Sequence, residues 1–534
     1  MSKSQIDSKP IPHGPFRNIR PLVFWPPALI LIATVAGSLY NIEGLLSAAT
    51  FGHEYILDEA GWLFLVGSFA AVIIVPMAAL SPLGRVRIGG IHAKPILSRW
   101  NWFAITLCTT IATGILFWGT AEPLMHYNAP AGFSGVAPRS NGAETFALAT
   151  LYLHWSFTPY AIYTAPALAF ALAYHNLGRP YSLSSPLRIA VGSIATGAGA
   201  AVIDGIALFA LVAGVAASLG AGMLTLADGL SALFGAPDGP TFRAVVGIFI
   251  VFSFVASSVS GLQRGIRVLS DLNVRIFFAF AVFIFIAGPS VSILRGMFLA
   301  VGEYIATFVP RSLAAPGGDV EQWRREWTMF NFANWSAWAP ITALFLGRIA
   351  VGYTVREFFV FTLVVPALFG MAWMSIFGGA TIGLDQMTSG LMTAALRERG
   401  PEGVIYAVLG ELPFTAVIVP LFLFTTFVSF VTAMDSNTDS ISNVCVGSSH
   451  KADRGPDGVL WVKIFWGALI GAVAWIMTAT SGIAGVRMLS NLGGLPGLLI
   501  VLASLVALVR LMLQPTSSLH DGVVVRDAAS AQGA

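Results

Sequence analysis

Long apolar segments recur from one end of the chain to the other, separated by short connections that are polar or marked by glycine and proline. A helix needs about 20 mostly apolar residues to cross a hydrocarbon core about 30 Å thick. The pattern therefore predicts twelve membrane-spanning helices, at residues 22–41, 61–82, 100–119, 146–174, 188–222, 243–262, 274–299, 326–347, 355–377, 413–445, 459–480 and 488–512.

Both ends of the chain are short and polar. We predict a tail at residues 1–20, a membrane domain at residues 21–512 and a second tail at residues 513–534. The first tail has no short apolar core followed by a small-residue cleavage site, so we expect no removable signal peptide.

The composition favours the same fold class, an all-α polytopic membrane protein. Hydrophobic residues make up 56% of the 534 residues and charged residues 10%, which leaves too little polar surface for a water-soluble globule. Cys108 and Cys445 lie among apolar residues, so we expect buried free thiols and no redox chemistry.

Basic residues lie in alternate connections, which predicts the orientation of the chain. The connection after the first predicted span carries four acidic residues and no Lys or Arg. The positive-inside rule therefore places both termini in the cytoplasm, in a cell inner membrane, and an even number of spans agrees with this. Residues 319–326 mix both signs and indicate a surface helix on the outside. The basic residues are Lys3, Lys9, Arg17, Arg20, Arg85, Arg87, Lys94, Arg99, Arg264, Arg267, Arg348, Arg356, Lys451, Arg454 and Lys463.

Two predicted spans are interrupted. The third runs CTTIATGILFWGTAEP and has small and β-branched residues through Thr110, Ala112 and Gly114; the eighth ends at Trp338-Ala339-Pro340. Unwound backbone offers free amide and carbonyl groups, which membrane proteins tolerate where it lines a cavity. These breaks predict a binding site near the middle of the membrane.

The stretch HWSFTPYAIY at residues 154–163 places aromatic rings around a proline. On an ideal helix Trp155, Tyr160 and Tyr163 fall within an arc of about 140°, so the three rings can face one space. The alternative is an interfacial belt of aromatic residues. Because Trp155 lies several residues inside the apolar run, we favour a cavity wall.

The stretch WTMFNFANWSAWAP at residues 327–340 adds a second set of rings. Trp327, Asn331, Asn334, Trp335 and Trp338 recur at intervals of three and four, which forms a single stripe. Asn side chains can join two helices, but close helix packing prefers small residues to Trp. We therefore favour a lined cavity. Quaternary ammonium groups are held largely by aromatic faces, so the cavity fits a methylated onium substrate.

Several motifs together resemble the betaine/choline/carnitine transporter family, over about residues 20–510. They are GTAEP at 119–123, HWSFTPYAIY, SLG at 218–220, SGLQRGIRVLSDLN at 260–273, WTMFNFANWSAWAP, GRIAVGYTVREF at 347–358 and TAMDSNTDS at 432–440. The resemblance implies a LeuT-like fold with two five-helix inverted repeats, and a homotrimer. It also implies a substrate cage of Trp155, Tyr160, Tyr163 and Trp335, with Trp338 as a further contact.

The chain departs from the family pattern in ways that leave the substrate open. Asn331 and Asn334 stand where many members have aromatic residues, and Tyr160 stands where a Trp is frequent. The glycine-rich stretch of the third span is represented by residues 110–114, with fewer glycines. Two amides near Trp335 can bind a carboxylate or a hydroxyl, which betaine, carnitine and choline supply in different combinations.

The coupling residues implied by the resemblance also differ. Sodium-coupled members use two threonines before the SLG motif, and the matching Leu211 and Val215 are apolar. They also use a Thr-Ser pair in the tenth span, matched here by Thr432 and Ala433. Sodium-independent exchangers carry an Arg close to the position of Arg275. We therefore expect sodium-independent transport.

Two acidic residues lie in or beside spans, where carboxylates are functional candidates by default. Asp204 is either a proton site or a partner for an arginine or the backbone, so proton symport and substrate exchange both stay open. Glu122 is expected at a helix end that water reaches.

The sequence therefore predicts a secondary transporter that imports a quaternary ammonium compound or a sulfonium analogue by alternating access. An amino-acid or other small-amine carrier is the alternative within transport, and a membrane-embedded sensor or enzyme is the alternative from another class. No paired metal-ligand motif or nucleophile motif is apparent, so we expect no enzyme activity, cofactor, metal or nucleic-acid partner.

Overall fold

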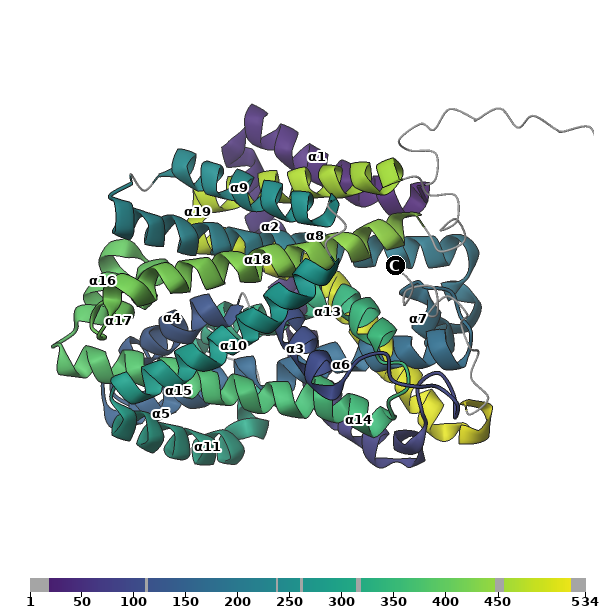
Figure 1. Ribbon diagram of the computed structural model, residues 1–534, viewed down its shortest axis with the longest axis horizontal. Helices are drawn as coiled ribbons and strands as arrows, with labels where there is room; N and C mark the ends of the chain where they lie inside the picture. The colour runs from purple at the N-terminus through teal and green to yellow at the C-terminus, as the bar shows by residue number, and fades with distance from the viewer. Residues whose placement is uncertain are drawn as a thin grey trace, which may run out of the picture.

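The computed structural model describes residues 19–110, 114–236, 239–259, 263–313, 318–446 and 456–519. The described chain is a helical bundle in which the long helices α8, α15 and α18 run in similar directions and α13 is inclined to them (Figure 1). Predicted tail residues 1–18 and 520–534 lie outside the described part.

The bundle contains long helices and short connecting turns. Its α-helices are α1 (Pro21–Tyr40), α2 (Ile42–Leu80), α3 (Arg99–Thr110), α4 (Gly114–Asn128), α5 (Asn141–Trp155), α6 (Phe157–Ala171), α7 (Ser184–Val191), α8 (Gly197–Phe234), α9 (Pro240–Val259), α10 (Gln263–Ala287), α11 (Ser290–Leu313), α12 (Gly318–Arg324), α13 (Phe330–Ile349), α14 (Val355–Phe359), α15 (Val365–Met387), α16 (Leu391–Arg399), α17 (Val404–Gly410), α18 (Thr415–Val446) and α19 (Pro456–Leu513). A π-helical turn, η5 (Arg325–Met329), leads into α13.

Eight helical segments of the described chain are long and apolar enough to cross a membrane. They are Pro21–Tyr40, Ile42–Leu80, Gly197–Phe234, Pro240–Ser257, Ser290–Leu313, Val355–Met387, Thr415–Val446 and Leu460–Leu513. The chain is therefore an all-helical, multi-pass membrane protein. The count of twelve spans and the two inverted repeats stay predictions.

Proline and glycine explain where the helices differ from the predicted spans. The predicted span 146–174 is divided at Ser156 into α5 and α6, because Pro159 has no N–H to donate to the Trp155 carbonyl. The prediction of one span over 274–299 is wrong: α10 ends at Ala287, before Gly288 and Pro289, and α11 begins at Ser290.

Three other predicted spans also differ from the helices. The run at 188–222 begins within α7, which ends at Val191, and α8 begins only at Gly197. The two spans predicted at 459–480 and 488–512 are the two halves of α19, which meet at Gly482. Gly482 has a φ of 54°, a left-handed conformation that glycine adopts without a side-chain penalty.

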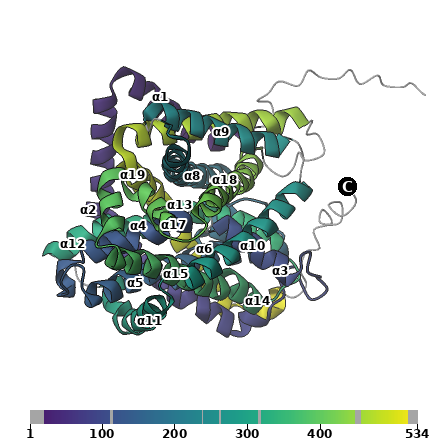
Figure 2. The ribbon, with the colours of Figure 1, turned by 60° about the vertical axis from the view of Figure 1, so that its left-hand side comes forward.

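Helix α13 lies inside the bundle, where α6, α8 and α19 pack against it (Figure 2). Glycines allow the close contact with α19. A Cβ atom on Gly494 would lie 2.6 Å from Ala333, and one on Gly497 would collide with the Ser336 carbonyl oxygen. Small residues that bring two backbones together are typical of helix contacts in membranes. This packing fixes α13, which carries Trp335.

Candidate functional site

Four aromatic side chains from three helices meet inside the bundle. The Trp335 ring centroid lies 5.4 Å from that of Trp155, 6.0 Å from that of Tyr160 and 5.0 Å from that of Tyr163. All four side chains are buried. The structure thus brings together the four residues predicted to form the cage, on α5, α6 and α13.

The helix break at Ser156 positions two walls of this cage. Trp155 is the last residue of α5, while Tyr160 and Tyr163 lie in the first two turns of α6. The Ser156 hydroxyl donates to the Tyr152 carbonyl and closes the end of α5. Trp335 is held by its indole N–H, which donates to the His154 carbonyl oxygen at 3.0 Å. Its ring faces are left to contact neighbouring rings.

The interrupted third span also reaches the cage. A Cβ atom on Gly114, the first residue of α4, would lie 2.7 Å from the Trp155 ring. Only a residue without a side chain fits this approach. Thr110 is the last residue of α3, and Ala112 lies outside the described residues.

The remaining residues of the predicted stripe have other partners. The Asn334 amide oxygen accepts a hydrogen bond from Ser490 of α19 at 3.0 Å. Asn331 donates to the Trp327 carbonyl oxygen at 3.0 Å. Trp338 packs against α8, where a Cβ atom on Gly214 would lie 3.1 Å from its indole. These are the helix contacts that polar residues make in bilayers, so substrate binding by these three residues stays a prediction.

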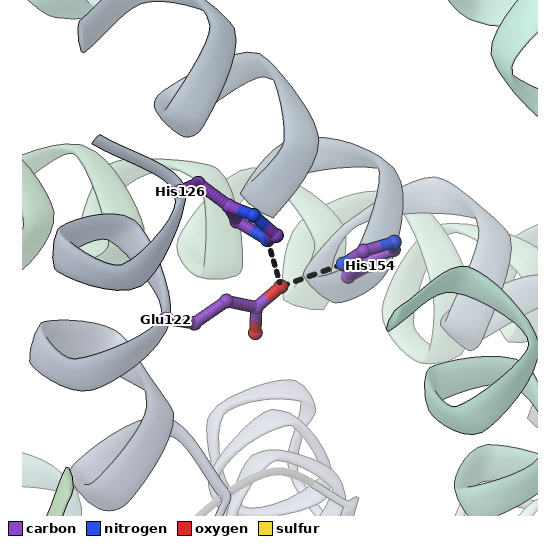
Figure 3. Close-up of side chains that lie close together, drawn as sticks. All are labelled: Glu122, His126 and His154. Atoms are coloured by element: carbon purple, nitrogen blue, oxygen red, sulfur yellow. Dashed lines mark hydrogen bonds and ion pairs between the residues drawn. The ribbon is translucent and has the colours of Figure 1, made fainter. Parts of the chain in front are cut away.

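A buried carboxylate and two imidazoles lie directly beside the cage (Figure 3). Glu122 and His126 lie one turn apart on α4, and His154 lies on α5. Glu122 Oε1 is 2.6 Å from His154 Nδ1 and 3.6 Å from His126 Nε2. Glu122 Oε2 accepts a hydrogen bond from the Trp155 indole at 2.7 Å. The expectation that water reaches Glu122 is wrong, because neighbouring helices bury it completely.

We refer to Glu122, His126 and His154 as the acid–imidazole cluster. One potential ligand atom of each residue lies within 4.8 Å of the others, which is close enough to consider a metal ion. Ligands of a tetrahedral zinc ion, at about 2.0–2.1 Å from the metal, stand roughly 3.3 Å apart. The 2.6 Å contact between Glu122 and His154 is instead the length of a charge-assisted hydrogen bond. We therefore interpret the cluster as a hydrogen-bonded group.

Sequence reasoning did not find this cluster or the arginine near it. Arg487 of α19 lies over the Trp327 ring, 4.6 Å from its centroid, and its Nε and Nη2 atoms are buried without a hydrogen-bond partner in the described chain. Two signals were present. Glu122 and His126 are four residues apart on one helix, and Arg487 lies between two apolar runs.

The predicted coupling residues make their contacts elsewhere. Asp204 forms an ion pair with Arg20 at 2.6 Å, and both of its carboxylate oxygens lie within hydrogen-bond distance of the Ser182 hydroxyl, which donates its one proton to them. It therefore has the arginine partner that was one of its two predicted alternatives. Arg275 pairs with Asp271 at 2.7 Å, and its side chain is 68% exposed. The Thr432 hydroxyl donates to the Val428 carbonyl of its own helix.

Comparison of the chain with a family model tests the resemblance that the motifs suggested. The model for the betaine/carnitine/choline family of transporters matches residues 22–516. The chain belongs to this family. The predicted resemblance is therefore confirmed, and the cage lies in a chain whose curated relatives are named as transporters.

Individual members of the betaine/carnitine/choline family are similar over nearly the whole chain. A glycine betaine transporter of Bacillus subtilis is 30% identical over 91% of this chain and 93% of its own. An ectoine/hydroxyectoine transporter of Virgibacillus pantothenticus is 28% identical over 92% of this chain and 96% of its own. A high-affinity choline transport protein of Escherichia coli is 29% identical, over 90% of this chain and 70% of its own.

A solved structure is similar at a lower level. It is described as the substrate-bound outward-open state of a Na⁺-coupled sialic acid symporter. The overlap covers 83% of this chain and 86% of that one, with a TM-score of 0.46 and 14% identity. This likeness is too weak to carry an argument about the site.

Proposed function

We propose that this protein is a secondary active transporter that imports a quaternary ammonium compound, such as betaine, choline or carnitine, or a sulfonium analogue. The observation that carries the proposal is the group of three rings around Trp335, with centroids 5.0–6.0 Å away. A methylated onium cannot donate an N–H hydrogen bond, and desolvated aromatic faces attract its charge. The names of the relatives for glycine betaine and choline support the same class of substrate.

The proposal includes a transport cycle and an assembly. Alternating access would expose the cage to each side of a cell inner membrane in turn, with twelve spans, two inverted five-helix repeats and both termini in the cytoplasm. The break between α5 and α6 next to Trp155 and the close approach of Gly114 to the Trp155 ring support a binding site at interrupted helices. A homotrimer is proposed from the family resemblance.

A ligand screen tests the substrate class. We expect at least one of betaine, choline, carnitine and dimethylsulfoniopropionate to raise the unfolding temperature of the purified protein, because a ligand that binds only the folded state stabilises it. The same compound should drive counterflow of radiolabel in proteoliposomes. Stabilisation by ectoine or by amino acids without a methylated onium, and by none of these four compounds, would favour the alternative carrier function.

We also propose that transport does not depend on sodium. Sodium is a hard cation that needs several oxygen ligands, and Leu211 and Val215 bring buried apolar side chains to α8 instead of hydroxyls. The initial rate of uptake into proteoliposomes should stay within about twofold when potassium replaces sodium at constant pH. A several-fold fall in that rate would contradict this proposal.

A further inference from the structure

The acid–imidazole cluster is connected to both tryptophans of the cage. Glu122 accepts the indole N–H of Trp155 at 2.7 Å, and the backbone carbonyl of His154 accepts that of Trp335 at 3.0 Å. The three side chains of the cluster are fully buried. Charge on the cluster therefore acts on the cage at short range and with little screening by water.

The hydrogen bonds of His154 allow it to gain a proton without losing a partner. Its Nδ1 atom contacts Glu122 Oε1 at 2.6 Å and the Asn331 amide nitrogen at 3.3 Å, and its Nε2 atom contacts the Thr328 hydroxyl at 3.1 Å. A hydroxyl can donate to a neutral imidazole nitrogen or accept from a protonated one. If Nδ1 carries a proton and donates it to Glu122, the Thr328 contact suits both the neutral and the charged ring.

His126 offers a second position for the same proton. Its two ring nitrogens have no hydrogen-bond partner in the described chain, and Nε2 lies 3.6 Å from Glu122 Oε1. A proton on Nε2 would draw the ring toward the carboxylate, because charge-assisted hydrogen bonds are shorter than this separation. An unpartnered buried imidazole that faces a carboxylate is a natural acceptor for a proton.

We propose that Glu122, His126 and His154 form a proton-binding site in the wall of the cage, and that one proton bound there weakens the binding of an onium cation. This inference deepens the proposed function and rests on it. It assigns the coupling or regulatory proton to the cluster instead of Asp204, whose carboxylate is engaged by Arg20.

The sign follows from the charges. With both imidazoles neutral the cluster carries the negative charge of Glu122; one proton neutralises it and removes the attraction for a cation in the cage. Linkage is reciprocal, so a bound cation lowers the affinity of the cluster for the proton by the same factor. Other charged groups lie on elements near the cluster. They are Arg487 on α19, Arg311 on α11 paired with Glu303, Glu326 in η5, Glu144 on α5 near Arg295, and Asp385 on α15 paired with Arg139.

The first experiment measures the proton site without ligand. Purified protein is titrated between about pH 5 and about pH 8 while tryptophan fluorescence is recorded, because a protonated imidazole quenches a nearby indole. We expect one step in the wild type, its loss in Glu122→Gln, which is an isosteric change, and a step at a different pH in His126→Gln, in which His154 can still take the proton. His175→Gln is the matched control, since His175 is buried elsewhere against the Gly347 carbonyl. An unchanged step in Glu122→Gln would overturn the proton site.

The second experiment measures linkage with glycine betaine and choline as probes. Calorimetric titration in two buffers of different ionisation enthalpy reports the protons released on binding. In the wild type we expect proton release near neutral pH and an affinity at least ~5-fold weaker at low pH than at high pH. Glu122→Gln should release none and should bind at high pH about as weakly as the wild type at low pH.

The outcomes separate the two proposals. Binding of a probe with the same affinity at both pH values would overturn the linkage while leaving the proposed function intact. If neither these probes nor the other onium compounds bind the wild type at any pH, the proposed function fails, and the fluorescence step alone then decides whether the cluster binds a proton.

Discussion

Replacement of Trp335 by leucine should lower the affinity for the onium substrate about thirtyfold while the protein still folds and inserts. Trp335 is the one ring that contacts all three of the others in the cage. A desolvated cation–π contact contributes about 2 kcal/mol, which corresponds to roughly a thirtyfold change in the dissociation constant. Binding is measured by calorimetry on purified protein, and folding by its elution and unfolding temperature.

Two further variants separate the aromatic face from the indole N–H. Trp335→Phe keeps a ring but loses the hydrogen bond to the His154 carbonyl, so we expect an intermediate loss of affinity. Trp461→Leu is the matched control, because that side chain is 54% exposed on α19. Substrate affinity in Trp335→Leu equal to that of the control would show that the four rings are a packing core and not a cage.

Much of the cage could be predicted because it depends on local spacing. Trp155, Tyr160 and Tyr163 lie within ten residues, and the proline among them explains the break that separates α5 from α6. Trp335 is far away in the sequence, and only its stripe of aromatic residues and the family resemblance linked it to the others. Its contact with the other rings is a property of the packed bundle.

The acid–imidazole cluster was harder to predict because it joins side chains across a helix interface. Glu122 and His126 share one face of α4, but nothing in the sequence says that His154 will lie 2.6 Å from the carboxylate. The error about Glu122 has a physical cause. Pro123 follows it, and a proline usually marks a helix end, yet α4 continues to Asn128.

Long-range pairing also changes the meaning of single charges. Arg20 counted as a cytoplasmic charge in the orientation of the chain, yet the structure pairs it with a fully buried carboxylate. Arg275 was matched to an arginine of sodium-independent exchangers as a candidate for coupling, and it forms a surface pair with a residue one turn away. In both cases the residue type was informative and the partner was not predictable.

Replacement of Arg20 by leucine should destabilise the protein by about 3 kcal/mol. Its guanidinium contacts Asp204 at 2.6 Å and the Val444 carbonyl at 3.1 Å, which ties the start of α1 to α8 and α18. Without Arg20 the buried carboxylate keeps only hydrogen bonds from Ser182 and the Ser184 backbone. Removal of one partner of a buried ion pair typically costs about 3–5 kcal/mol. The free energy of unfolding is measured in mixed detergent.

The order of three related variants makes this test specific. Asp204→Asn should lower the free energy of unfolding less than Arg20→Leu does. The amide oxygen still accepts a hydrogen bond from Ser182, and the Arg20 side chain, which is 29% exposed, can reach water. The double variant should be more stable than Arg20→Leu alone, since it leaves no unpaired buried charge. Arg275→Leu, which breaks an exposed pair, should stay within about 1 kcal/mol of the wild type. A different result would make Asp204 a coupling group: wild-type stability in Arg20→Leu together with loss of transport in Asp204→Asn. The charge of Asp204 would then serve the transport cycle and not the fold.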